Sequence, residues 1–148
     1  MKQVYFLIIS VAIFLASCSV FKKDNLPKIE EPTARFMNTK WVLTAINGKA
    51  ITVNFEKPIY IKIVDDKSFK GNASCNQIWG VCKQMNTAIQ FSNIGRTKMH
   101  CENMQQEEKL IANLKLAEAY LITADKLQLL TKEGKIVLQF QAIEEKKQ

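Results

Sequence analysis

The sequence predicts an α+β fold dominated by antiparallel strands. Short segments in which apolar and polar residues alternate follow one another along most of the chain, with turn-forming residues between them. One later segment instead carries apolar residues at helical spacing. The 148 residues are 47% hydrophobic and 24% charged, which suits one domain with tails. We therefore expect about eight strands in a curved sheet or partly open β-roll or barrel, with one amphipathic helix packed on it.

The strands are expected in chain order from their apolar patterns. The first is apolar and ends at Asn47-Gly48, a dipeptide that favours a two-residue hairpin. Later patterns are interrupted by the turn signals Asp65-Asp66 and Glu133-Gly134. The expected strands are residues 41–46, 59–63, 68–71, 88–92, 119–124, 126–130 and 136–140.

The helix is expected over residues 107–117. Leu110, Ile111, Leu114 and Ala117 recur at helical offsets and would face the sheet. Acidic residues at the start of this segment suit the positive end of the helix dipole.

The N-terminus predicts export and lipidation. Residues 4–14 form an apolar run that is too short for a permanent membrane span and follows the charged Lys2. The run ends in Leu15-Ala16-Ser17-Cys18, which resembles the lipobox of bacterial lipoproteins. We expect residues 1–17 to be a signal peptide and Cys18 to become the acylated N-terminus. The alternative is an ordinary secretory signal with a coincidental cysteine.

The remaining organisation follows from this expectation. Residues 18–37 would be the lipidated N-terminus and a flexible tether, because this segment has no periodic pattern and contains two of the three prolines. Residues 38–143 would be the folded domain, and 144–148 a charged tail. Because Ser19 is not the aspartate that retains enteric lipoproteins at the inner membrane, we expect a lipid-anchored protein of the bacterial cell envelope, at the outer membrane.

The charge distribution argues against nucleic-acid binding. The formal net charge is +7, yet only Arg35 and Arg96 among the 21 basic residues are arginines. Lysine-rich surfaces are less suited to bidentate phosphate recognition. We expect no nucleic-acid partner and a monomer.

The sequence does not decide which cysteines form a disulfide. Lipidation of Cys18 would leave Cys75, Cys82 and Cys101, so one disulfide and one free thiol are expected in an oxidising envelope. Cys75 and Cys82 would face opposite sides of one regular strand and could not bridge. Either can pair with Cys101.

Two motifs carry a family resemblance. Residues 71–80 (GNASCNQIWG) and 94–101 (IGRTKMHC), followed by Glu107, resemble the META domain of HslJ-type heat-shock lipoproteins over roughly residues 36–142. Gln77 and Lys98 stand where the family usually has arginine, so an amide and an ammonium replace two guanidiniums. The motif positions kept in this chain are Cys75, Asn76, Gly80, Thr97, Met99 and Cys101.

The resemblance implies a curved mixed sheet with a helix, no established enzymatic activity, and a link to envelope stress and antibiotic tolerance. It also implies a disulfide between Cys75 and Cys101, with Cys82 free. The disulfide would fasten two motif loops into a rigid surface. The residues expected on that surface are Asn76, Trp79, Thr97, Lys98 and Met99. Asn76 and Thr97 would satisfy backbone groups of the loops, Lys98 would face an acidic partner, and Trp79 would serve either as an apolar anchor or in packing.

The sequence gives less support to two chemical functions, a thiol enzyme and a zinc site. A thiol enzyme would need an imidazole beside a thiolate. His100 is next to Cys101, so these two would face opposite sides of an extended segment, which leaves Cys75 or Cys82 as the alternative partner of His100. Together with Cys75 and Cys82, His100 and Cys101 would also make a Cys3His zinc set, but the spacings lack the usual close pairs. We expect no enzyme activity, no cofactor and no metal.

Two functions remain open from the sequence. One is a membrane-anchored interaction or stress-protection module that binds an envelope protein. The other is a binder of small molecules that uses the concave face of the sheet. A filled core would favour the first, and a deep apolar cavity the second.

Overall fold

The computed structural model describes residues 31–54, 57–101 and 104–143. The predicted signal peptide, Cys18, the start of the tether and the charged tail lie outside these residues. No helix within the described ranges has the length and apolarity needed to cross a bilayer. The elements there are β1 Lys40–Ile46, β2 Lys49–Ala50, β3 Tyr60–Ile63, β4 Ser68–Asn72, β5 Gln77–Met85, β6 Ala88–Arg96, α2 Met104–Leu116, β7 Ala119–Thr123, β8 Lys126–Leu130 and β9 Ile136–Ile143.

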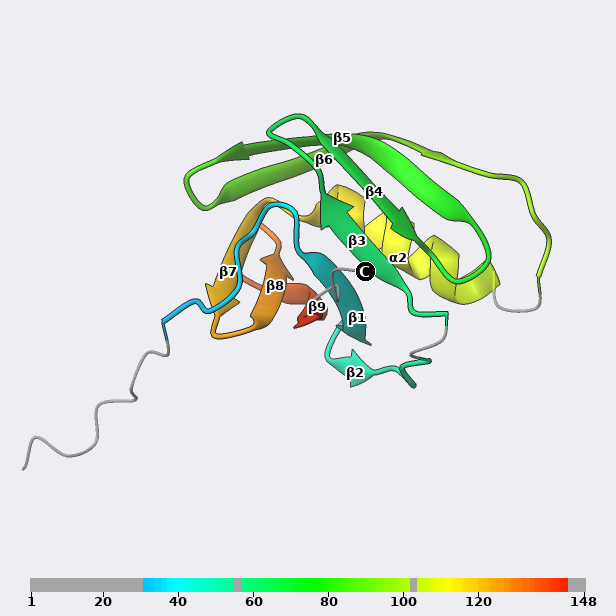
Figure 1. The fold of residues 1–148 in the computed structure, drawn as a ribbon, viewed down its shortest axis with the longest axis horizontal. Helices are drawn as coiled ribbons and strands as arrows, with labels where there is room; N and C mark the ends of the chain where they lie inside the picture. The colour runs from blue at the N-terminus through cyan, green and yellow to red at the C-terminus, as the bar shows by residue number, and fades with distance from the viewer. Residues whose placement is uncertain (1–30, 55–56, 102–103, 144–148) are drawn as a thin grey trace, which may run out of the picture.

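The strands form one antiparallel sheet that closes on itself. Their order is β2-β1-β3-β4-β5-β6-β7-β8-β9, and β1 also pairs with β9. Eight strands therefore make a ring, and the short β2 extends one side of β1 through the Asn47-Gly48 hairpin (Figure 1). The α+β class is confirmed, with about eight strands and one helix in the part of the chain that the structure describes.

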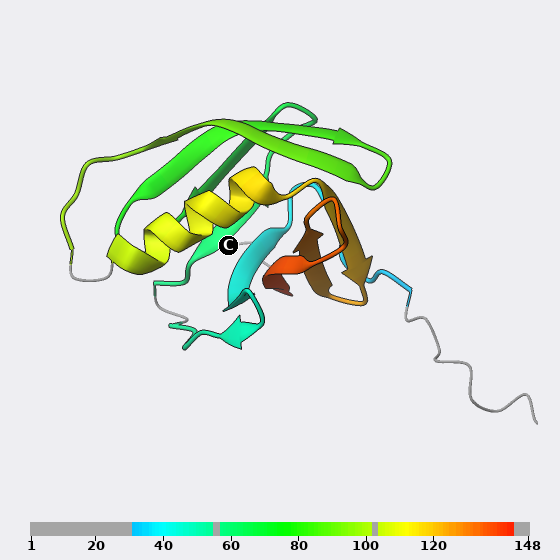
Figure 2. The same ribbon diagram turned by 180° about the vertical axis from the view of Figure 1, so that it is seen from behind.

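The ring is uneven where α2 is inserted in the chain. β6 and β7 share only the register pair Ala88 and Ala119, whereas β5 and β6 pair over most of their length. The helix between them packs against β6, β9 and β1, with Leu110 and Leu114 fully buried (Figure 2). It thereby covers the side on which the strands separate.

Side chains fill the interior of the ring. The largest fully buried ones come from both halves of the sheet and from the helix, and Phe69 meets Phe91 edge to face at 5.1 Å. The concave face of the sheet is therefore occupied by the core. Its largest members are Trp41, Phe69, Phe140, Leu43, Ile61, Ile63, Ile78, Leu110, Leu114, Leu127, Leu129 and Leu138.

Strand β5 was not among the expected strands. Ile78 and Cys82 point into the core, while Trp79 lies on the outer side, so the segment does alternate. Gly80 weakens the sequence pattern because it supplies no inward side chain. A Cβ there would lie 2.8 Å from the Phe69 ring, which occupies that space instead. Trp79 therefore lies within a strand.

The start of the domain and of the helix also differ from expectation. The Thr33 amide donates to the Ala124 carbonyl at 2.9 Å, and Phe36 stacks on Tyr120 with ring centroids 4.3 Å apart. The Trp41 indole donates to the Phe36 carbonyl at 3.0 Å. The last residues assigned to the tether are thus part of the domain. Helix α2 begins at Met104, three residues before the expected start.

Candidate functional site

The site is built around a bulge in β6. Val81 pairs with Ser92 and Trp79 with Gly95, so β6 contains one extra residue between these pairs. Asn93, with φ of 49°, lies in this interval. The bulge shifts the alternation by one residue, and Arg96 therefore pairs with the inward-facing Ile78. Without it, the pattern set by the buried Ile89 and Phe91 would turn Arg96 outward.

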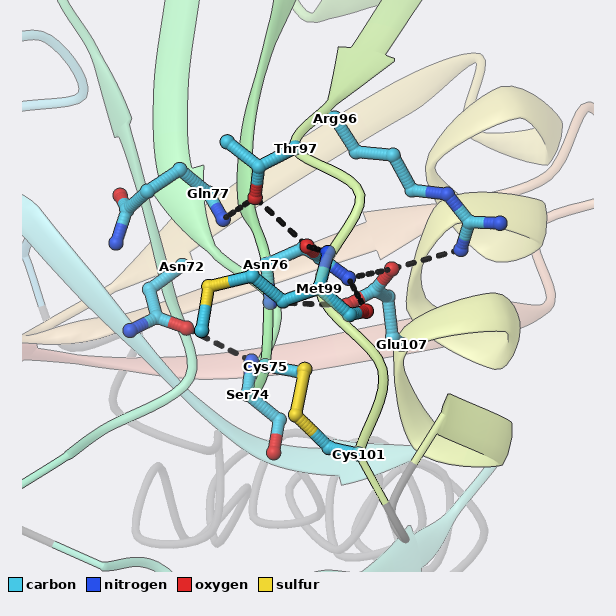
Figure 3. Close-up of polar contacts among 10 residues, drawn as sticks. All are labelled: Asn72, Ser74, Cys75, Asn76, Gln77, Arg96, Thr97, Met99, Cys101 and Glu107. Atoms are coloured by element: carbon cyan, nitrogen blue, oxygen red, sulfur yellow. Dashed lines mark hydrogen bonds and ion pairs between the residues drawn. A yellow bond between two sulfur atoms is a disulfide. The ribbon is translucent and has the colours of Figure 1, made fainter.

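Arg96 meets a buried carboxylate on the helix. Glu107 is fully buried near the start of α2. Its Oε1 accepts from Arg96 Nη1 at 2.7 Å and from Asn76 Nδ2 at 3.1 Å, and its Oε2 accepts from the Asn76 amide at 3.1 Å (Figure 3). A buried carboxylate is costly unless it is paired and hydrogen bonded, and here both conditions are met.

Asn76 connects this pair to the segment that follows β6. Its Oδ1 accepts from Thr97 Oγ1 at 2.7 Å and from the Met99 amide at 2.8 Å. Its Nδ2 donates to the Met99 carbonyl and to Glu107, both at 3.1 Å, which uses the side chain's full hydrogen-bonding capacity. Thr97 Oγ1 also accepts from the Gln77 amide at 3.2 Å. We call Asn76, Arg96, Thr97 and Glu107 the polar clip.

A disulfide lies beside the polar clip. Cys75 and Cys101 are bonded through their sulfurs, with Cα atoms 6.1 Å apart. The backbone before Cys75 makes a tight turn, since Ser74 has φ of 98° and its amide donates to Asn72 Oδ1 at 2.8 Å. The covalent link and the polar clip therefore fasten the same two segments, the turn before β5 and the chain after β6.

Comparison with known proteins identifies the family. A family model described as META domain matches residues 34–144. This chain belongs to the META domain family. No curated protein sequence is significantly similar to it. Three solved structures are similar in fold. Two of them have only 20% sequence identity to this chain, so they are evidence for the fold alone.

The first of these structures is an NMR structure of a protein with 27% identity and a TM-score of 0.57, covering 72% of this chain and 90% of that chain. The second is an NMR structure of a protein from Burkholderia xenovorans, with 20% identity and a TM-score of 0.61, covering 86% and 100%. The third is a crystal structure of a DUF4847 family protein from Bacteroides vulgatus, with 20% identity and a TM-score of 0.53, covering 72% and 93%.

Of the five residues expected on the surface of this META domain, some are exposed and others are not. Asn76 is buried, with 1% of its surface exposed, and Thr97 is half-buried within the polar clip. Both side chains satisfy backbone groups of the motif loops, as expected. The expected place of Asn76 on the surface was wrong, because its side chain is enclosed. Lys98 and Met99 are exposed, and Trp79 is 49% exposed on the outer side of β5.

Trp79 does two things at once. A Cβ added at Gly95 would lie 2.8 Å from the Trp79 indole nitrogen, so the ring covers the glycine on the neighbouring strand. Since half of the side chain is exposed, the ring also presents an accessible surface. Both readings of this residue, packing and exposure, are consistent with the structure.

Sequence reasoning missed Arg96 and Glu107 as members of the site. Glu107 has the same helical spacing to Leu110 and Leu114 as a buried residue would have, and this signalled its burial. Asn93 was the corresponding signal for Arg96, because asparagine tolerates the left-handed backbone that the bulge requires.

The third cysteine is inaccessible to solvent. Cys82 is fully buried on the inner side of β5, and this burial, with a smaller contribution from Asp65, raises the pKa of its thiol to about 12. A thiol of this kind is a poor nucleophile and metal ligand. Across the described ranges, no three His, Cys, Asp or Glu side chains are grouped in a way that would hold a metal ion.

Open grooves lie beside α2 on the outer surface of the domain. One groove of about 580 Å³ lies between β6 and α2, and its lining is mainly apolar. The lining residues are Ile94, Arg96, Glu108, Ile111, Ala112, Lys115 and Leu116. Another of about 930 Å³ lies between the β1–β2 hairpin and the start of α2. Both are on the outside of the ring rather than in its filled interior.

Proposed function

We propose that this META-domain chain is a lipoprotein of the bacterial cell envelope, anchored at the outer membrane through Cys18. Its folded domain acts without covalent chemistry, as an interaction module that protects the envelope under stress. The observation that carries this proposal is the polar clip, in which the motif residues satisfy one another. The motif then serves to hold a surface in place rather than to perform a reaction.

The state of the cysteines supports a role without covalent chemistry. Cys75 and Cys101 are bonded to each other, and Cys82 is buried with its pKa raised. His100 is exposed on the segment after β6, whereas Cys82 is in the core. A catalytic dyad needs its base within hydrogen-bond reach of the nucleophile, and a buried thiol and an exposed imidazole do not meet that need.

Two substitutions test this part of the proposal. His100→Ala and Cys82→Ala chains should protect a deletion strain from envelope stress as well as the wild-type chain does, once differences in folded abundance are taken into account. Loss of protection by either variant at normal abundance, with the disulfide intact, would mean that the domain performs chemistry.

The lipid anchor is tested at Cys18. Mass spectrometry of the membrane-extracted protein should find an N-terminus at this residue carrying acyl chains, and density-gradient fractions should place the protein with the outer membrane. Cys18→Ser should block processing. An unmodified or uncleaved N-terminus in the wild-type chain would remove the anchoring claim.

A small-molecule binder is the second candidate. The core occupies the concave face, so a ligand would have to use an outer groove. The mainly apolar lining of the groove between β6 and α2 is the observation that favours such a ligand. Ala112→Trp would fill this groove from its exposed side. If small molecules co-purify with the wild-type chain and are lost from this variant, the binder is supported; if none co-purifies with either chain, it is not.

A further inference from the structure

The charged residues within β3, β4, β5 and β6 are all basic, since these four strands contain no aspartate or glutamate. Phe69 and Cys82 mark the inner side of β4 and β5, so the alternation turns Lys70 and Lys83 outward, and both are exposed. In Figures 1 and 2, β4, β5 and β6 arch over α2, so this outer face points away from the helix. We call it the lysine face.

Trp79 lies within the lysine face. Register pairs join Lys62 to Lys70, Lys70 to Trp79 and Trp79 to Gly95, which makes one row across the four strands. Because Gly95 has no side chain, the indole lies flat over β6 and keeps about half of its surface exposed. Tyr60 adds a second amphipathic ring on β3, with Lys40 Nζ 4.6 Å from its centroid.

We propose that the lysine face docks on the anionic phospholipid headgroups of the membrane to which the chain is anchored. Exposed lysines such as Lys70 and Lys83 are attracted to an anionic lipid surface. Tryptophan and tyrosine rings, apolar in body and polar at one edge, prefer the depth of the headgroups. The row therefore combines the two kinds of side chain that a lipid surface selects.

The choice of a lipid over an acidic protein rests on the kind of cation. Lysine is a point charge, whereas arginine is preferred where a carboxylate is bound by two parallel hydrogen bonds. The only arginine in the four strands is Arg96, and its guanidinium is paired with Glu107 on the helix side of β6. The lysine face therefore offers diffuse positive charge, which suits a surface of many mobile headgroups.

The length of the tether permits this contact. This step rests on the proposed anchor at Cys18, which is 14 residues before Pro32. An extended chain of that length reaches at most about 50 Å. That is longer than the radius of a domain of this size, about 15 Å, so the face can reach the bilayer that holds the anchor.

The experiment uses the lipidated protein in nanodiscs and measures tryptophan fluorescence. Trp41 is fully buried and provides a constant background, so changes report Trp79. In discs of phosphatidylglycerol with brominated acyl chains, we expect quenching and a blue shift that are absent in brominated phosphatidylcholine discs and reduced at high salt. Trp79→Phe should remove the response. Equal signals in the two lipids, or none in either, would overturn the proposal.

A matched pair of charge reversals identifies the face. Lys70→Glu with Lys83→Glu should reduce the quenching at least fivefold. Lys126→Glu with Lys135→Glu changes the net charge equally on β8 and before β9, on the other side of the ring, and should leave quenching near the wild-type value. Equal losses from both pairs would mean that net charge alone drives the response and would overturn the proposal.

Two further outcomes distinguish lipid docking from protein binding, and failure of the proposed anchor from failure of the proposed docking. Binding of a poly-glutamate peptide that is lost with Lys70→Glu and Lys83→Glu, in the absence of lipid quenching, would make the face a protein site and overturn the proposal. If mass spectrometry finds Cys18 unmodified, the anchor fails; the purified native chain is then tested by flotation with phosphatidylglycerol and phosphatidylcholine vesicles. Flotation with phosphatidylglycerol alone supports the face, and no flotation overturns it.

Discussion

The inner and outer faces of the β5–β6 pair use their side chains in opposite ways. Inward, Arg96 is bound by Glu107, and Cys82 is enclosed by the core. Outward, Lys83 is exposed and Trp79 is half exposed over a glycine. The inner face is therefore committed to holding the fold, whereas the outer face has groups that remain accessible to a partner.

This difference changes how the family motif is understood. Cys75, Asn76, Thr97 and Cys101 carry the resemblance, and each is bonded within the domain. Trp79 and Lys70 lie outside the shared motif positions. The motif therefore describes a fastening between the turn before β5 and the chain after β6, and the accessible surface of this chain is elsewhere.

The largest effect is expected from removing the buried carboxylate. Glu107→Ala leaves two buried N–H groups of Asn76 without acceptors and should lower the free energy of unfolding by ~4 kcal/mol. The loss of the ion pair contributes less, because the Arg96 side chain is 38% exposed and water can solvate it. Urea denaturation measures the total loss of stability. Glu108→Ala is the matched control, because Glu108 is exposed, and it should change stability by less than about 0.5 kcal/mol. Similar small losses for both would mean that the polar clip is not structural.

Removal of the disulfide should cause the second largest loss of stability. Its cysteines are 26 residues apart, and in the loop-entropy account such a link stabilises a fold by about 3 kcal/mol. Cys75→Ala with Cys101→Ala should therefore lower the midpoint of urea denaturation, whereas Cys82→Ala should leave the disulfide intact in peptide maps made without reductant. A bridge from Cys82 to Cys101 in the wild-type chain would contradict the pairing.

The pH dependence of stability tests the burial of Cys82. The folded pKa is about 12, above the ordinary value of 9.0, so only the unfolded chain releases this proton between these values. Stability from this thiol is complete below about pH 9 and falls by roughly 1 kcal/mol per pH unit as the pH rises toward 12. Plots of the free energy of unfolding against pH should therefore fall more steeply for the wild type than for Cys82→Ala over this range. Parallel pH profiles would place the thiol in contact with water.

The smallest effect on stability is expected on the outer face. Trp79→Ala uncovers Gly95 and should lower the free energy of unfolding by less than ~1 kcal/mol, because half of the side chain is already exposed. Trp79→Phe should retain most of the covering contact. Thermal unfolding of the two variants checks this order. A loss comparable to that of Glu107→Ala would place Trp79 with the inner face.

Much of the fold is readable in the sequence because its strands are short and alternate clearly. The Asn47-Gly48 hairpin is present, with φ of 49° and 75° at the two residues. Strand β5 was missed because Gly80 removes one inward side chain, and the space is filled by Phe69 from another strand. Closure by β1 and β9 depends on pairing between distant segments, which local patterns do not encode.

The candidate site was harder to predict than the fold. The family resemblance identified Cys75, Asn76 and Cys101, but it could not say which polar groups face inward. One extra residue at Asn93 decides that Arg96 points at Glu107. A bulge changes the side on which every later residue of the strand lies, so the direction of Arg96 follows from the register rather than from its neighbours in the sequence.

The most direct test of the contrast between the two faces compares envelope-stress survival per folded molecule in a complemented deletion strain. Asn76→Ala represents the inner face, and Lys70→Glu with Lys83→Glu the outer face; folded abundance is measured by pulse proteolysis of membrane fractions. Survival with Asn76→Ala should fall only as far as the folded amount does, so that the ratio stays at the wild-type value. The charge-reversed chain should give a lower ratio at normal folded abundance. A lower ratio for Asn76→Ala, together with a wild-type ratio for the charge-reversed chain, would reverse the roles assigned to the two faces.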